Sequence, residues 1–264
     1  MPNHVQNILD FYAEGERLKQ ILTEIQDDEY GMGSIDFNKI IPMPESLNIE
    51  SGSKTDKGYK MVLKMLEQLM PIQAVLNNPD SNKAAVEKAE IQKAALQQKY
   101  ESMSDEEKET FALGKQYYDN IQKYGAGDWY HWSIANWDTK WNAYNFSGDE
   151  TGVIFQTAWS ASHNIIRTIS EKYPEVRISH RWADEDLGNN LGEREYLGGE
   201  ITYENIPNPC SKEAYDMAFE IWEYEPEELG FTLNADGTEY IELPEEDNRL
   251  FLPESNEDDE ELEE

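Results

Sequence analysis

The sequence predicts an α+β fold in which an antiparallel sheet carries helices on one face. Three observations lead to this prediction. Apolar residues alternate with period two in segments near the start and the end of residues 1–204. Amphipathic helical segments follow two of these alternating segments. A tryptophan-rich stretch lies between the first and the last alternating segments. A run of helical segments at about residues 50–125 interrupts this pattern. We therefore expect a domain over residues 1–204 with a helical insertion at about 50–125.

The first elements are a strand, a helix and a second strand. Residues 3–12 alternate, with Val5, Asn7, Leu9 and Phe11 on one face. After Gly15, apolar residues recur at helical spacing up to residue 25. The segment 35–41 is compatible with a strand, and the prolines that follow it are accepted by neither a helix interior nor a central strand.

Three helices are predicted within the insertion. Apolar residues recur every three or four positions over residues 59–70, and a thin apolar stripe marks residues 82–100. Ser104 followed by Glu107 forms a capping box that opens the third helix. We expect these helices to pack against one another, and the alternative is an arm that binds a partner.

The tryptophan-rich stretch, residues 127–159, contains five of the seven tryptophans. Asp128 is a candidate N-cap for a short helix, and a hairpin is expected to follow, with strands near 141–146 and 153–155. A single helix continuing to Phe146 is the competing interpretation. The bulk of these rings predicts a buried aromatic core, with a ligand-stacking role as the alternative. The expected core tryptophans are Trp129, Trp137, Trp141, Trp159 and Trp182.

The second half predicts a helix over 160–173, a strand over 176–184 and short strands near Tyr196 and residues 201–203. With the insertion set aside, the order is strand, helix, two strands, helix, strand, which is the ferredoxin-like pattern. Residues 205–253 predict an acidic extension made of a helix and a hairpin. The acidic run at 254–264 is expected to be a solvated, disordered tail.

Charge is the strongest functional signal in the sequence. The chain has 55 acidic and 22 basic residues, a net charge of −33. Residues 200–264 carry −21 of this charge and the other 199 residues carry −12. Such a field repels nucleic acid and anionic membranes, and it attracts basic proteins. We therefore expect a basic partner and no direct binding to nucleic acid or membrane.

The acidic residues of the predicted helix at 211–224 form the candidate partner-binding surface. They recur at three and four residues and so form one stripe, although a merely solvated face has the same pattern. The candidates are Glu213, Asp216, Glu220 and Glu223 on the stripe, with Glu227 and Glu228 after it.

Catalytic chemistry finds little support in the sequence. His180, Asp184 and Asp186 would share a strand face and could bind a divalent cation, but a polar strand end is the more common explanation of this pattern. Cys210 has no neighbouring histidine to activate it. Neither a phosphate-binding glycine loop nor a serine triad is evident. We expect no enzymatic activity and no cofactor.

Cysteine content is typical of a reducing compartment, and segment hydropathy predicts neither a signal peptide nor a membrane span. A single cysteine excludes an intrachain disulfide. The first residues lack a basic region followed by an apolar run, and no stretch has the roughly 18 apolar residues that span a bilayer. We expect a cytoplasmic location.

Five segments resemble the YubB family of ferredoxin-like proteins from phages and plasmids. These are MPNHVQN at the start, IDFNKIIPMPESL at 35–47, GDWYHWSIANWDTKWNAYN at 127–145, IFQTAWSASHNII at 154–166 and YPEVRISHRWADEDLGNNLGE at 173–193. Together they cover most of residues 1–203. The sequence departs from the family at Asp138, where glycine is expected. The resemblance implies a ferredoxin-like fold and an origin in a mobile element, with no established enzymatic activity.

Two functional classes follow from the charge and the resemblance. The first is an anti-defence inhibitor of the anti-CRISPR or anti-restriction type, whose acidic surface imitates nucleic acid and blocks a host nucleic-acid-binding complex. The second is a nucleic-acid or nucleotide-handling protein, because ferredoxin-like sheets often present aromatic side chains to bases.

Overall fold

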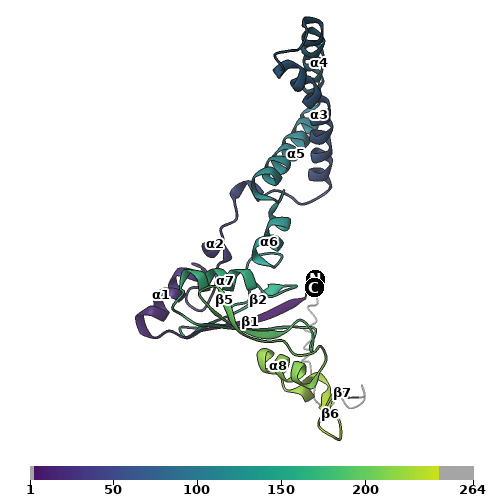
Figure 1. Ribbon diagram of the computed structural model, residues 1–264. Helices are drawn as coiled ribbons and strands as arrows, with labels where there is room; N and C mark the ends of the chain where they lie inside the picture. The colour runs from purple at the N-terminus through teal and green to yellow at the C-terminus, as the bar shows by residue number, and fades with distance from the viewer. Residues whose placement is uncertain (1–2, 244–264) are drawn as a thin grey trace, which may run out of the picture. The chain divides into compact units, whose positions relative to one another are not determined.

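The computed structural model describes residues 3–243, which form two compact units (Figure 1). One unit contains residues 3–41 and 137–243, and the other contains residues 42–136. We call them the sheet unit and the helical unit. The helical unit is wider than the insertion predicted at about 50–125, and residues 205–243 belong to the sheet unit. The predicted tail at 254–264 lies outside the described residues.

The sheet unit is built around a five-stranded antiparallel sheet with the order β2-β1-β3-β4-β5. Its strands are β1 (His4–Phe11), β2 (Gly152–Ala158), β3 (Ile178–Asp184), β4 (Gly192–Leu197) and β5 (Glu200–Asn205). Its helices are α1 (Gly15–Ile25), α2 (Phe37–Ile40), α7 (His163–Lys172) and α8 (Lys212–Trp222). A 3₁₀ turn, η2 (Pro226–Leu229), precedes a small hairpin of β6 (Phe231–Leu233) and β7 (Tyr240–Glu242).

Strand β1 lies at the centre of the ferredoxin-like core. It pairs antiparallel with β2 on one side and with β3 on the other, for example Leu9 with both Val153 and His180. Because α7 connects β2 to β3 with β1 between them, these elements form a split βαβ unit. The predicted ferredoxin-like α+β fold is therefore confirmed.

The two faces of the sheet are covered by different helices. Alternate residues of β1, such as Val5 and Leu9, are fully buried, and Figure 1 shows α1 and α7 over one side of the sheet. On the other side Ile8 and Ala183 pack in a cluster with Ala214 of α8. The helices predicted for the ferredoxin-like core thus share one face, and the helix of the acidic extension occupies the opposite face.

Two predicted strands are replaced by other structure. Residues 35–41 contain the short helix α2, because the Asp36 side chain accepts a hydrogen bond from the backbone N–H of Asn38 and caps the first turn. Residues 141–146 form only a single bridge, between Tyr144 and Gln156. The Asn142 amide supports α2 instead, donating to Asp36 and accepting from the N–H of Phe37. The competing single helix to Phe146 is also excluded, because the helix ends at Trp137.

The predicted aromatic core is correct in part. Trp137 and Trp182 are buried, and the indole N–H of Trp137 donates to the carbonyl of Ile41. Trp129 and Trp141 are half-buried. The prediction is wrong for Trp159, which is 42% exposed. The residue follows directly after β2 with a φ of +73°, so the chain turns and the ring does not continue the inward alternation of the strand.

The helical unit contains the three predicted long helices. Its elements are η1 (Glu45–Leu47), α3 (Ser53–Asn77), α4 (Lys83–Glu101), α5 (Asp105–Tyr124) and most of α6 (Trp129–Trp137). The capping box is confirmed, with the Ser104 hydroxyl accepting from the N–H of Glu107 and the Glu107 carboxylate accepting from the N–H of Ser104. At the start of α6, Asp128 accepts from the N–H of His131 as the N-cap prediction required.

Backbone contact between α3 and α5 holds the helical unit together (Figure 1). A Cβ atom at Gly58 would meet the carbonyl oxygen of Thr110 and the backbone of Gly114, and a Cβ at Gly114 would meet the backbone of Gly58. Only glycine at both positions permits this approach. The buried side chains around it are few, chiefly Val62 and Phe111.

Candidate interaction site

Helix α8 positions the acidic residues that the sequence singled out. The Ser211 side chain caps the helix by accepting from the N–H of Ala214. Ala214, Ala218 and Ile221 face the sheet and are buried, so the intervening polar positions face outward. The helix ends at Trp222, because Glu223 adopts a left-handed conformation with a φ of +56°.

A groove of about 520 Å³ runs beside α8 and is dominated by carboxylates. Glu213, Asp216 and Glu220 line it from the helix, while Asp10 of β1 and Glu193 of β4 line it from the sheet. The other lining residues are Tyr12, Ser179, Arg181, Asn205, Pro207 and Met217. Five acidic side chains and a single basic one therefore surround the same hollow.

Ion pairs neutralise only part of this groove. Arg181 donates to Glu220 at 2.6 Å, and Lys212 donates to Asp216 at 2.6 Å. Among the residues that the structure describes, Asp10, Glu193 and Glu213 have no cationic partner within 4 Å. The net charge of the lining is negative, so the groove favours cationic groups of a partner.

Tyr240 connects the small hairpin to the acidic helix. Its hydroxyl donates to Asp216 at 2.9 Å. Burial, together with the hydrogen bond to the Asp216 carboxylate, raises the pKa of Tyr240 to about 12. The phenol therefore stays protonated at neutral pH and remains a donor, which orients the Asp216 carboxylate beside the groove.

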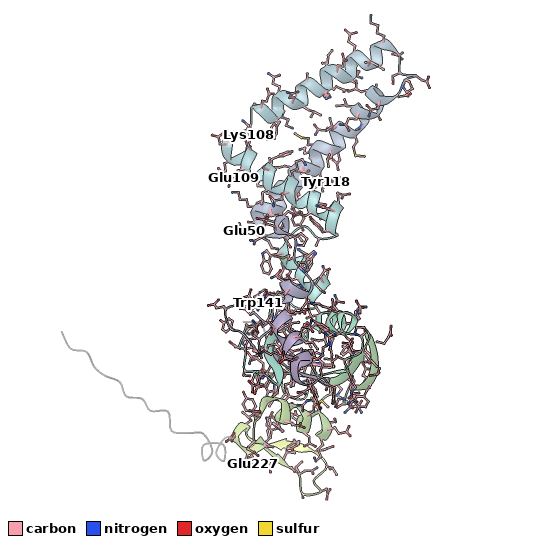
Figure 2. The ribbon with its side chains drawn as sticks, turned by 90° about the vertical axis from the view of Figure 1, so that its left-hand side faces the viewer. Glu50, Lys108, Glu109, Tyr118, Trp141 and Glu227 are labelled. Atoms are coloured by element: carbon pink, nitrogen blue, oxygen red, sulfur yellow. The ribbon has the colours of Figure 1, made fainter. Side chains whose placement is uncertain are left out.

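The structure separates the predicted partner-binding residues into two groups. Glu213, Asp216 and Glu220 line the groove. Glu223 leaves the predicted stripe because it terminates the helix. Glu227, which is labelled in Figure 2, belongs to η2 with Glu228; both are exposed, and neither lines the groove. Sequence reasoning missed Asp10 and Glu193, because nothing in their local sequence indicates that strand pairing brings them beside α8.

The weak metal-binding candidates have other roles. His180 is fully buried, and its Nε2 lies 3.0 Å from the side-chain oxygen of Asn7. Asp184 accepts from the side-chain amides of Asn3 and Asn190, and the N–H of Asp186 donates to it. Within residues 3–243, no three His, Cys, Asp or Glu side chains are grouped as a metal ion would need.

A buried polar cluster lies around the two histidines of α7 and β3. The rings of His163 and His180 are 5.3 Å apart, and that of His163 is 4.4 Å from Trp182. Burial, reinforced by the charge of Arg194, lowers the pKa of His163 to about 4, although Glu204 acts in the opposite direction. Burial also lowers the pKa of His180 well below its usual value. Both rings are uncharged at neutral pH, which suits a structural role.

Comparison with protein families agrees with this fold. Residues 136–225 match the family model described as the ferredoxin-like domain in Api92-like protein. This segment is therefore similar to that ferredoxin-like domain. A crystal structure of protein api92 from Yersinia pseudotuberculosis aligns with 79% of this chain and 99% of its own, at 9% identity and a TM-score of 0.34. No curated protein matches the sequence. In residues 3–243, the helices are too short or too polar to cross a membrane.

Proposed function

We propose that this protein binds a basic partner through the acidic groove beside α8. The observation that supports this most is the convergence of five carboxylates from a helix and two strands on one hollow that contains a single, already paired guanidinium. Loose acidity for solubility does not require such convergence. A partner that brings lysine or arginine side chains would replace the missing countercharges, which favours both encounter rate and specificity.

We further propose that the partner is a host protein that binds nucleic acid, and that the groove and its surroundings imitate a phosphate backbone. Duplex DNA carries one charge per roughly 1.7 Å of its axis, so a mimic needs closely spaced carboxylates on a folded scaffold. Together with the sequence resemblance to phage and plasmid proteins, this favours an anti-defence inhibitor of the anti-CRISPR or anti-restriction type. No chemical step is required of it.

The test uses carboxylates without ion pairs, so that no cation is left unpaired. Glu193→Gln/Glu213→Gln removes two charges from the groove, and Glu87→Gln/Glu90→Gln removes two exposed charges from α4 as the matched control. The partner is identified by pull-down from host lysate and mass spectrometry, then purified. We expect the groove variant to bind it about tenfold more weakly, with a flatter salt dependence, and the control to bind normally.

Competition separates mimicry from simple charge attraction. If the groove imitates nucleic acid, a DNA or RNA duplex that the partner binds must displace the protein. Equal affinity for the groove variant and the control would refute the groove as the site. Unaltered binding in the presence of saturating nucleic acid would refute mimicry while leaving the groove as a protein-binding surface.

A second candidate function, direct binding of nucleic acid, is favoured by one feature of the helical unit. Lys57, Lys60 and Lys64 recur at three and four residues on α3, are exposed, and line a hollow of about 440 Å³ with Ser53, Asp56 and Met61. Lys57→Glu/Lys60→Glu/Lys64→Glu should abolish any mobility shift of an oligonucleotide, whereas Lys83→Glu/Lys88→Glu/Lys93→Glu on α4 should not. Absence of a shift with the unmodified protein at low salt would exclude this candidate.

A further inference from the structure

Two indole rings and one ammonium group meet on the surface of the sheet unit. The Nζ atom of Lys140 lies 4.4 Å from the ring centroid of Trp141 and 4.9 Å from that of Trp159. Both distances are within the roughly 6 Å over which a cation is attracted to the face of an aromatic ring. Trp141, labelled in Figure 2, is half-buried, and Trp159 is 42% exposed. The ammonium therefore marks a position where a cation is held by two rings that solvent can reach.

The backbone of Trp159 is strained, and its neighbours hold it in place. A φ of +73° is unusual for a bulky residue and costs on the order of 1–3 kcal/mol. The N–H of Trp159 donates to the carbonyl of Asn3 at 2.9 Å, and its carbonyl accepts from the side chain of Asn190 at 3.0 Å. This strain is not compensated by full burial of the ring. Backbone strain of this kind is concentrated at functional positions.

Two carboxylate residues are linked to this position through hydrogen bonds and ring contacts. Asn190, which supports Trp159, also donates to Asp184 at 2.8 Å. The N–H of Glu185 donates to the carbonyl of His4, and the His4 ring contacts the Tyr144 hydroxyl at 2.7 Å. Tyr144 in turn lies 6.4 Å from Trp141, between ring centroids. Asp184 and Glu185 thus make the surroundings of the indole pair electronegative, which attracts cations.

Lys140 is weakly held at this position. Within the described residues, no carboxylate lies within 4 Å of its Nζ atom, in contrast to most cations of the sheet unit. Its long side chain has many rotamers, so the ammonium can leave the rings without breaking an ion pair.

We propose that Trp141 and Trp159 form a binding site for an organic cation, the side chain of an arginine or an alkylated lysine. In the free protein the Lys140 ammonium group occupies this site, and the ligand displaces it. The site lies outside the lining of the α8 groove and does not depend on the function proposed for it. Guanidinium and alkylammonium groups suit two indoles because they are less strongly hydrated than a simple metal cation and give up water at lower cost.

Tetramethylammonium chloride is the probe, with sodium chloride at equal ionic strength as the reference. Binding is followed by the NMR shifts of the assigned indole N–H groups. We expect saturable shifts at Trp141 and Trp159 and loss of binding in Trp159→Ala. Lys140→Met keeps an aliphatic side chain but removes the ammonium group that competes for the rings. This variant should therefore bind tetramethylammonium about threefold to fivefold more tightly. Lys19→Ala removes an exposed lysine of α1 and is the matched charge control, expected to leave affinity unchanged.

Several results would overturn the proposal. One is that tetramethylammonium shifts neither indole N–H signal, in the unmodified protein or in Lys140→Met. Another is that Lys140→Met and Lys19→Ala bind tetramethylammonium with equal affinity. A third is that Trp159→Ala binds it as the unmodified protein does. Shifts of the same two indoles by a short oligothymidine but not by tetramethylammonium would identify a base-stacking site instead. Glu193→Gln/Glu213→Gln should bind the probe normally, so failure of the α8 groove and failure of this site are distinguishable.

Discussion

The sheet unit and the helical unit differ in their balance of acidic and basic residues. Residues 3–41 and 137–243 contain 30 acidic and 10 basic residues, whereas residues 42–136 contain 14 acidic and 11 basic residues. In the described sheet unit, eight of the ten cations form ion pairs with carboxylates; in the helical unit only Lys54 and Lys115 do so. The sheet unit therefore presents a large excess of unpaired carboxylates, whereas the helical unit presents unpaired lysines interspersed with unpaired carboxylates.

This comparison changes what the net charge means. A value of −33 for the chain suggests a uniform field that repels nucleic acid. The repulsion belongs to the sheet unit and the C-terminal residues, because the helical unit is close to neutral. A charge summed over a chain with two compact units describes neither of them, and binding arguments should be made for each unit separately.

The units also differ in how they are stabilised. The sheet unit has a deep core of fully buried side chains, including Leu9, Phe37 and Phe155. The helical unit has few buried side chains and depends on backbone contact between Gly58 and Gly114. Mutations in the two units should consequently have separate effects on stability.

Phe155→Ala should have the largest effect. The ring is fully buried and lies 5.9 Å from Phe37, so its removal should lower the free energy of unfolding of the sheet unit by about 3–5 kcal/mol. Hydrogen exchange should show loss of protection in β1 and β2, with α3 and α5 still protected. Equal loss in all four elements would show that the units unfold together and that the comparison fails.

Gly58→Ala should destabilise the helical unit by about 3 kcal/mol, because the new methyl group meets backbone atoms that cannot rotate away. Gly52→Ala is the control, since its Cβ would meet only the flexible Glu50 side chain. Exchange protection should fall in α3 and α5 only for Gly58→Ala. Similar protection in both variants would show that the two helices can separate slightly without cost.

Acidification should weaken the sheet unit through His163. Its pKa is about 4 in the folded protein and about 6.5 when unfolded, so the unfolded state binds more protons between these values. The free energy of unfolding contributed by this group is therefore complete above pH 6.5 and falls as pH drops towards 4, by about 3 kcal/mol. Denaturant titrations across this window should show a shallower pH dependence for His163→Phe. Parallel pH curves for the two proteins would contradict the assignment.

Trp159→Ala should have the smallest effect on stability, within about 1 kcal/mol, because the residue is 42% exposed and lies outside the buried core. Thermal unfolding followed by circular dichroism measures this effect, with buried Trp137→Ala as the contrasting variant. A large fall in the midpoint for Trp159→Ala would restore the core role that the sequence predicted.

The sequence by itself determined the elements whose signals are local. Helical spacing of apolar residues predicted α1, and the Ser104 and Glu107 pair predicted the start of α5. The strands β1 and β3 followed from alternation, and the acidic stripe of α8 followed from its spacing. These features depend on residues a few positions apart, so their physical causes are visible in a short window.

Only the tertiary structure decided features that join distant residues. Asn142 supports α2 from a distant part of the sequence by accepting from the N–H of Phe37 and donating to the capping residue Asp36, where the sequence predicted a strand. Strand pairing brings Asp10 and Glu193 beside Glu213. The backbone of Trp159 is held beside Lys140 by two hydrogen bonds, one donated to the carbonyl of Asn3 and one accepted from the side-chain amide of Asn190. The reason is physical: a side chain's burial and charge environment depend on which segments pack against it, and no local periodicity encodes that choice.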